Sequence, residues 1–332
     1  MTAPYGSTAS GAALVVSGIG VVTPWTDQPE KAAVSDRPAV PGQWFDHRTR
    51  LGPRGYKYLP PASQFFLAAA KYALVDADDD PARHPAEQRG AAVGTNSSAV
   101  ALHDGMDRTV LEESADALSP VAAPYFSINL FGSRLATEHG LKGFNLTLTT
   151  PRVAGLESLE TGARAVAAGR ATWLLAGATE EALPEEQPGH GSSERGAVAL
   201  VLEPADAVRA RGGRAYGRCQ VSSHFLAPAS AASAEGPERA RRLIDRGLAG
   251  WGGAALGEAG APRVIAVVDG SAVGRAVVSA VGPSAAVAAA GAGALEPLLQ
   301  VAAALTELTA PVLVVASAPG GNLSLALLTP AP

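Results

Sequence analysis

The sequence lacks the side chains on which several classes of protein chemistry depend. Its single cysteine, Cys219, excludes an internal disulfide and any metal site built from several cysteines. It also has no excess of basic residues, because its formal net charge at pH 7 is −5. A chain of this charge offers no basic surface for nucleic acid, and we expect no nucleic-acid partner.

The sequence has no long, clean apolar run either. The alanine-rich stretch 285–305 is interrupted by Gly291, Gly293, Glu296 and Pro297, so it is not expected to span a bilayer. The opening MTAPYGSTASGAA has no basic segment followed by an apolar one, as a signal peptide would. We therefore expect a cytoplasmic protein with no membrane contact, in which residues 1–12 are disordered.

Aromatic residues are scarce, at 5% of a chain that is 47% hydrophobic, so the core must consist mainly of Ala, Val and Leu. Apolar runs typical of buried strands alternate with helical patterns. Residues 14–25 are expected to form a buried strand, a glycine-containing turn and a second short apolar run. Further strands are expected at 91–94, 145–150, 172–177, 197–203, 214–226, 263–270, 311–317 and 323–329. Helices are expected at 62–77, 100–111, 153–169, 205–213, 237–252 and 294–308. One more helix is expected before Gly140, with His139 in its last turn. This alternation predicts α/β architecture with an internal duplication.

Two local patterns need separate interpretation. Gly18-Ile19-Gly20 is not expected to bind a dinucleotide, because no third glycine follows and Pro24 stands where the helix would begin. We interpret it as a tight turn. The stretch 143–155, GFNLTLTTPRVAG, predicts a buried strand that turns sharply into a helix, with Arg152 at the turn. Enzymes place nucleophiles at such turns, because the helix N-terminus offers free N–H groups.

Several motifs in order resemble the β-ketoacyl synthases of the thiolase fold. GFNLTLTTPRVAG matches the family's nucleophile motif in length, with Gly143, Asn145, Thr150 and Gly155 in place. VVSGIGVVTP, VGTN, GRATWLLAGATEE and GAVALVLEPADAVRARGGRAYG resemble flanking segments, so the resemblance covers nearly the whole chain. It implies two duplicated βαβαβ halves, 13–205 and 206–332, in one compact unit with a layered α-β-α-β-α arrangement and a shortened second half.

The family's catalytic groups are all replaced. Arg152 stands at the position of the nucleophilic cysteine, Asp269 at that of the first histidine, and Val287 is assigned to the second. An arginine stays protonated and cannot attack a thioester. The resemblance therefore implies that the chain has no catalytic residues, is not an enzyme on its own and needs no cofactor.

The profile resembles one subgroup of the family, the chain length factors of type II polyketide synthases, and within it the forms that accompany polyene-making systems. The subgroup implies an inactive subunit that pairs with an active ketosynthase, in a heterodimer or heterotetramer. It shapes the tunnel that receives the growing chain, which an acyl carrier protein carries. The alternatives are a stand-alone acyltransferase or decarboxylase of the thiolase fold with non-standard catalytic residues, and a purely structural scaffold.

The resemblance also implies two sets of site residues. The dimer interface is expected at Asn145, Leu146, Thr147, Leu148, Thr149, Thr150 and Arg152. The tunnel lining is expected at Val100, Ala101, His103, Asp104, Met106, Pro124 and Tyr125. The alternative for the first set is an interior strand with no partner, and for the second set ordinary core packing.

The role of Arg152 is open between two hypotheses. It makes a local ion pair with Glu157 or Glu160, or its guanidinium fills the pocket of the missing cysteine and fixes the heterodimer or tunnel wall. The remaining candidates point to no chemistry. His103, His139, His190 and His224 have no spacing of a triad or a metal site, so no metal site is expected. Cys219 is expected to be a buried core residue.

Overall fold

The computed structural model describes residues 14–37, 43–121, 123–125 and 127–331. The disorder expected of residues 1–12 therefore lies outside the described residues. Within these ranges, no helix combines the length and the apolar character that crossing a membrane requires.

In the described part of the chain, ten strands form two five-stranded sheets. The first sheet contains β1 (Leu14–Val22), β2 (Arg89–Gly94), β3 (Asn145–Leu148), β4 (Trp173–Glu180) and β5 (Gly196–Pro204), in the order β1-β5-β4-β2-β3. The second contains β6 (Arg218–Phe225), β7 (Arg263–Val268), β8 (Ala286–Ala289), β9 (Val312–Ser317) and β10 (Asn322–Thr329), in the order β6-β10-β9-β7-β8.

The two sheets have the same topology. In each, the first strand pairs antiparallel with the fifth and the fifth antiparallel with the fourth, whereas the second strand pairs parallel with both the fourth and the third. The predicted duplication is confirmed. The third strand of each half, β3 or β8, lies at the sheet edge.

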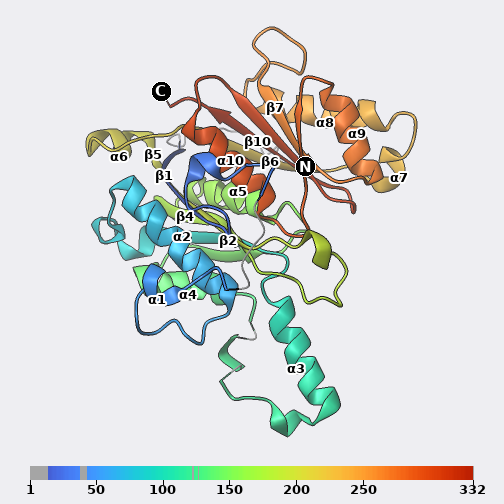
Figure 1. Cartoon of the computed structure of the whole chain (residues 1–332). Coiled ribbons are helices and arrows are strands. Elements are labelled where there is room, and N and C mark those ends of the chain that lie inside the picture. Colours follow the sequence, from blue (N-terminus) through green and yellow to red (C-terminus); the bar gives the residue numbers. More distant parts are fainter. Residues whose placement is uncertain (1–13, 38–42, 122, 126, 332) are drawn as a thin grey trace, which may run out of the picture.

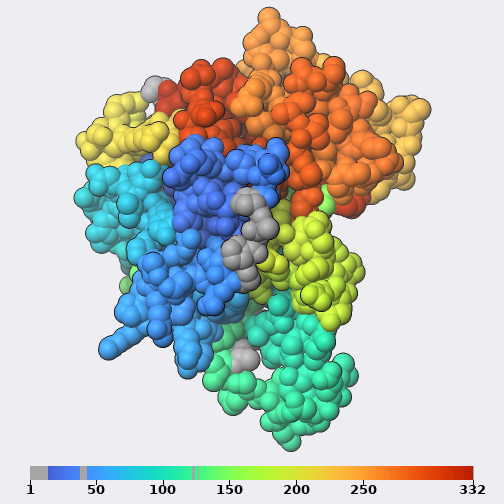
Figure 2. Space-filling view, in the orientation of Figure 1, coloured from blue at the N-terminus to red at the C-terminus, as the bar shows by residue number. Residues whose placement is uncertain are grey.

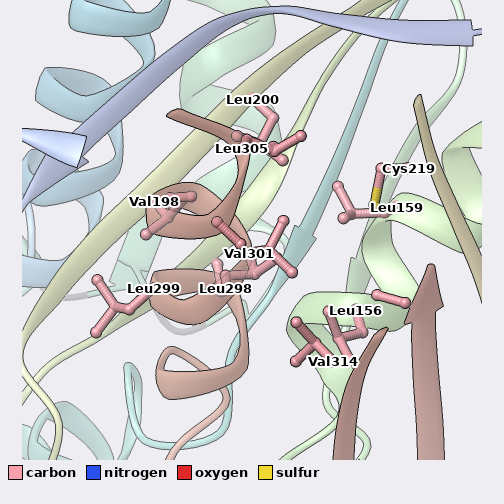
Figure 3. Packing of buried hydrophobic residues seen from close by; sticks show 14 of the residues in the cluster. Leu156, Leu159, Val198, Leu200, Cys219, Leu298, Leu299, Val301, Leu305 and Val314 are labelled. Carbon is pink, nitrogen blue, oxygen red and sulfur yellow. The ribbon is translucent and has the colours of Figure 1, made fainter. Parts of the chain in front are cut away.

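Helices form three layers around the two sheets (Figure 1). The outer face of the first sheet is covered by α2 (Pro61–Ala77) and α4 (Leu130–His139), and that of the second by α8 (Gly236–Gly250) and α9 (Ala272–Val281). Between the sheets lie α5 (Ala154–Ala167) and α10 (Glu296–Thr306). Figure 3 shows leucines of both central helices directed at the strands. This is the layered thiolase-like arrangement that the sequence predicts.

The remaining helices are peripheral. They are α1 (His47–Arg50), α3 (Val100–Glu112), α6 (Ala205–Ala210) and α7 (Pro228–Ala231). Short 3-10 helices lie at Pro29–Lys31, Pro81–Arg83, Ala86–Gln88, Ala115–Ala117, Ala123–Tyr125 and His190–Ser192. Helix α3 projects away from the layered body together with the segment that follows it (Figures 1 and 2).

The turn expected at Gly18-Ile19-Gly20 is wrong, because β1 runs through it with only a register irregularity between Val16 and Gly18. The glycines serve helix packing instead. A Cβ at Gly18 would lie 2.1 Å from the Ala73 carbonyl oxygen, and one at Gly20 would lie 1.9 Å from that of Ala69. The backbone of β1 can therefore lie close against α2.

Candidate functional site

The site is centred on the turn between β3 and α5. The strand ends at Leu148 rather than at Thr150 as expected, because its partner β2 ends at Gly94, opposite Leu148. Beyond the strand, Asn96 Nδ2 donates hydrogen bonds to the carbonyls of Thr149 (3.0 Å) and Thr150 (3.3 Å). Asn96 Oδ1 in turn accepts from the backbone N–H of Arg152 at 2.8 Å. One side chain at the end of β2 thus fixes the whole turn.

Arg152 occupies the apex of this turn in a left-handed backbone conformation, with φ 64°. A side chain in this region meets its own carbonyl oxygen, which costs about 1–2 kcal/mol. The sharp strand-to-helix turn predicted for residues 143–155 is therefore present, and it holds its apical side chain at the N-terminal end of α5.

The guanidinium of Arg152 crosses to the second half of the chain. Its Nη1 lies 2.8 Å from Asp269 Oδ2 and donates to the Ser317 carbonyl at 3.2 Å, while Nε donates to the Gly291 carbonyl at 3.2 Å. The side chains of Arg152 and Asp269 are 13% and 24% exposed. Three segments of the second half therefore converge on one arginine.

Of the two hypotheses for Arg152, the local ion pair with Glu157 or Glu160 is wrong, because the guanidinium pairs with Asp269 instead. The carboxylate of Glu160 binds Arg164 and the hydroxyl of Ser223 instead. The physical reason is position, because Arg152 precedes the first residue of α5 and its side chain extends to Asp269 and Ser317 in the second half of the chain.

Asp269 is held as a carboxylate. Burial opposes its ionisation, but hydrogen bonds from Ser271 and the charge of Arg152 outweigh burial and lower its pKa. An ionised Asp269 beside an arginine forms a stable ion pair at neutral pH. The pair occupies the space where the resemblance places a nucleophile and its histidine.

Val287 does not join these two residues. It lies on β8 opposite Ala266 of β7 and is 56% exposed. The segment that reaches Arg152 from this part of the chain is the loop after β8, through Gly291. The structure therefore brings together two of the three residues that the resemblance assigns to catalytic positions.

A pair of buried carboxylates lies beneath the turn, and no sequence pattern pointed to it. Glu180, at the end of β4, accepts from the backbone N–H groups of Asn96, Ser97 and Ala294, each at 2.7 Å. Glu194 accepts from Leu295 N–H at 2.7 Å. These bonds fasten the loop after β2 to the start of α10. Residues 95–98 serve this network and do not cap α3, which has no side-chain cap in the described structure.

Burial sets the protonation of both carboxylates. It raises the pKa of Glu180, and together with the charge of Glu180 it raises the pKa of Glu194 to about 8. Glu194 therefore holds a proton at neutral pH, which relieves repulsion between the two groups. Glycines make this close approach possible, because a Cβ at Gly293 would lie 2.5 Å from Glu194 Oε2.

The single cysteine offers no replacement nucleophile. Cys219 is a buried core residue, as predicted, and its sulfur lies beside Leu159 (Figure 3). Burial raises its pKa to about 12, so the thiol stays protonated. Two histidines make contacts that serve the fold, His190 Nδ1 with the Leu183 carbonyl at 2.7 Å and His224 Nε2 with Ser222 Oγ at 2.9 Å.

The strand β3, which the sequence predicts to be buried, lies at the edge of the first sheet. Among the strands that the structure describes, β3 pairs only with β2, and Leu146 is 40% exposed. The alternative of an interior strand is therefore wrong. The residues expected at the interface lie at this edge, half-buried or exposed: Asn145, Leu146, Thr147, Leu148, Thr149, Thr150 and Arg152.

The residues expected to line a tunnel lie on α3 and the segment after it. The structure describes all of α3, and none of its residues is buried, so ordinary core packing does not explain Val100, His103 or Met106 in the single chain. Ala101 lines two neighbouring hollows, which also share Pro61 and Glu181. The first, of about 440 Å³, contains Tyr125. The second has a volume of about 460 Å³.

Two other residues of this set have different surroundings. Asp104 binds Arg108 at 3.1 Å and accepts from Gln187 Nε2 at 3.3 Å. Pro124 is exposed. Ala101, Leu102 and Val121 contribute apolar side chains to the hollow with Tyr125, together with Leu59, Pro60 and Pro61.

Comparisons with known proteins agree with the topology. Residues 15–218 match the family described as β-ketoacyl synthase, N-terminal domain. The 3-oxoacyl-[acyl-carrier-protein] synthase 2 of Vibrio cholerae is 23% identical over an alignment of 285 residues, and the match covers 75% of this chain and 68% of that protein. The protein of the same name from Vibrio harveyi is 25% identical over an alignment of 180 residues, and the match covers 46% of this chain and 43% of that protein.

Two solved structures have the same fold. The ishigamide ketosynthase/chain length factor superposes with a TM-score of 0.75 at 22% identity, covering 96% of this chain and 100% of that chain. AntDE:AntF, a type II polyketide synthase acyl carrier protein in complex with its ketosynthase bound to the hexaketide, superposes with a TM-score of 0.74 at 14% identity. This match covers 97% of this chain and 99% of that chain.

Proposed function

Because the chain belongs to the β-ketoacyl synthase family, we propose that it is a catalytically silent subunit of the chain length factor type. The observation that carries the proposal is the Arg152–Asp269 ion pair at two catalytic positions of the family. Condensation needs a thiolate nucleophile, and decarboxylation needs hydrogen-bond donors for the developing enolate. A protonated guanidinium and an ionised carboxylate supply neither the nucleophile nor a general base of suitable pKa.

The proposed partner is an active ketosynthase, in a heterodimer or heterotetramer. The free edge of β3 supports this, because an edge strand offers unpaired N–H and C=O groups to a strand of another chain. The ishigamide protein of similar fold is a ketosynthase/chain length factor, which supports the same pairing here. The AntDE:AntF complex supports an acyl carrier protein as the second partner, which we place mainly on the active subunit.

The proposed contribution of this chain is the wall of a tunnel. The hollows beside Ala101 are open, and one is lined by apolar and aromatic side chains next to a projecting, unburied α3. A partner that covers α3 would enclose this space. Product length would then follow from the length and apolar lining of the cavity rather than from chemistry. We include the polyene-type assignment in this proposal.

Co-expression with the neighbouring ketosynthase tests the proposal, followed by mass analysis of the chains carried by the acyl carrier protein. We expect the two subunits to co-purify and extended chains to form only when both are present. Full-length products from the ketosynthase alone would contradict the proposal.

The isolated chain tests the enzyme alternative. Incubated with acyl- or malonyl-loaded carrier protein, it should neither acquire an acyl mass nor release carbon dioxide. Either signal, if lost in the Arg152→Ala or Asp269→Asn variant, would favour a stand-alone acyltransferase or decarboxylase instead.

A further inference from the structure

Three potential metal ligands meet on the outer side of the first sheet, away from the site described above. Asp79 follows the end of α2, His84 follows the 3-10 helix Pro81–Arg83, and Glu203 lies near the end of β5. Each offers one ligand atom, and the three atoms lie within 4.8 Å of one another. The sequence indicated no metal site, because Glu203 is distant from the other two residues along the chain and only the fold brings it to them.

The two carboxylates are oriented, each through one oxygen. Asp79 Oδ2 accepts from Trp173 Nε1 at 2.9 Å and lies 2.9 Å from His84 Nε2. Glu203 Oε1 accepts from Arg211 Nη2 at 2.8 Å and from the Ser17 hydroxyl. Such outer contacts are what fixes the ligands of a metal site.

The second oxygen of each carboxylate has no hydrogen bond. Among the described residues, Asp79 Oδ1 and Glu203 Oε2 have no hydrogen-bond partner. Both side chains are only 1% exposed, so both oxygens are buried. Arg83 approaches Asp79 Oδ1 to 3.9 Å, but the Arg83 side chain is 62% exposed. Buried carboxylate oxygens without partners are unfavourable, so these two point to a missing ligand.

We propose that Asp79, His84 and Glu203 bind one divalent transition-metal ion, with Zn²⁺ as the best match. One imidazole and two carboxylates are a donor set that suits Zn²⁺ better than Mg²⁺, which prefers oxygen ligands alone. His84 is 21% exposed, so it leaves a side open for water as a fourth ligand. Arg211 offsets one carboxylate charge, and the cation offsets the other.

The ion would have a structural role. It ties the end of α2 to the end of β5, just before α6 (Ala205–Ala210) and the crossing into the second half. A ligand that binds only the folded chain raises its unfolding temperature. This site and the proposed function are independent of each other.

Metal titration of the full-length, EDTA-treated protein tests the site, with Co²⁺ as a spectroscopic probe and Zn²⁺ as competitor. We expect one equivalent of Co²⁺ to give visible absorption of a low-coordinate site, which one equivalent of Zn²⁺ abolishes. Zn²⁺ should also raise the unfolding temperature, and Mg²⁺ at the same concentration should not.

The variants separate this site from adventitious binding. His84→Ala and Glu203→Gln should each weaken Zn²⁺ binding at least about tenfold, whereas His47→Ala, on α1, should bind as the natural chain does. Circular dichroism of the metal-free variants verifies folding. Failure of the natural chain to bind one equivalent, or equal affinity in His84→Ala, would overturn the proposal and leave a shared proton as the explanation of the two oxygens.

Discussion

The carboxylate of Asp269 lies 2.8 Å from the guanidinium of Arg152, and the two residues are 117 positions apart in the sequence. They come from opposite halves of the duplicated fold. The family's chemistry would take place at this junction, and here an ion pair holds it together. Its consequences for stability can be measured directly.

Asp269→Asn should lower the free energy of unfolding by about 1–2 kcal/mol, because it leaves the largely buried Arg152 without a counter-ion. Asparagine can still accept the Ser271 N–H, so the change mainly removes charge. Denaturant unfolding measures the effect. The exposed Asp206–Arg209 pair is the control, and Arg209→Ala should change stability by less than about 0.5 kcal/mol. An equal effect at both sites would contradict the prediction.

Because Arg152 has a left-handed backbone conformation, we expect two substitutions at this position to differ in stability in an unusual order. Arg152→Gly should be more stable than Arg152→Ala by about 0.5–1 kcal/mol, because both lose the ion pair but only glycine tolerates φ 64° without strain. In the interior of α5 the order should reverse, so Ala163→Gly should destabilise the chain by about 1 kcal/mol. Thermal or denaturant unfolding of the three variants checks the left-handed turn.

Glu194 predicts a pH dependence of stability. Its pKa is raised to about 8 in the folded chain from an ordinary value of 4.5, so the folded state binds more protons than the unfolded state between these pH values. The contribution of Glu194 to the free energy of unfolding is therefore fully present below pH 4.5 and is lost as pH rises through about 8. Glu194→Gln mimics the protonated form and should flatten this decline.

The quantity to measure is the difference in the free energy of unfolding between the natural chain and the Glu194→Gln variant, from pH 5 to 8.5. It should change by up to about 1.4 kcal/mol for each unit of pKa shift. Glu258→Gln, in an exposed loop, is the matched control and should leave the profile unchanged. A pH-independent difference for Glu194→Gln would show that Glu194 is ionised throughout.

The edge strand predicts a specific effect on assembly. Leu146→Asp should weaken binding to the ketosynthase partner at least about tenfold, because it places a charge at the apolar edge of β3. Val75→Asp is the control, because Val75 is 75% exposed and lies on the outer helix α2. This helix packs mainly on β1 and β5, at the end of the sheet opposite β3. Measuring the affinity of each variant for the ketosynthase partner tests this prediction. Equal binding by both would remove β3 from the interface.

The hollows beside α3 predict control of product length. Ala101→Phe should shift the chains on the carrier protein toward shorter lengths, because Ala101 borders both hollows and a larger side chain occupies their volume. Glu112→Ala, at the far end of α3, should leave the products unchanged. Mass analysis of the co-expressed complex distinguishes the two. An unchanged distribution in Ala101→Phe would favour the purely structural scaffold.

Much of the fold was predictable because its elements are local patterns. The spacing of Phe65, Ala69 and Tyr72 predicts α2, and the apolar run 311–317 predicts β9. α9 and β8 were missed, because α9 is short and rich in valine, which favours strands, and β8 has only four residues, three of them alanine. The turn expected at Gly18 and Gly20 was wrong, since what glycine permits there is contact with a distant helix.

The sequence by itself determined what this protein lacks. Its resemblance to the family assigns Arg152 and Asp269 to the positions of a cysteine and a histidine, and this assignment needs no coordinates. Only the tertiary structure decided what replaces the lost chemistry. The ion pair across the two halves, the carboxylates of Glu180 and Glu194, and the exposed edge of β3 all depend on how distant segments pack. Local sequence patterns report backbone preference and burial, but contacts between distant residues form only when both sheets and their helices are in place.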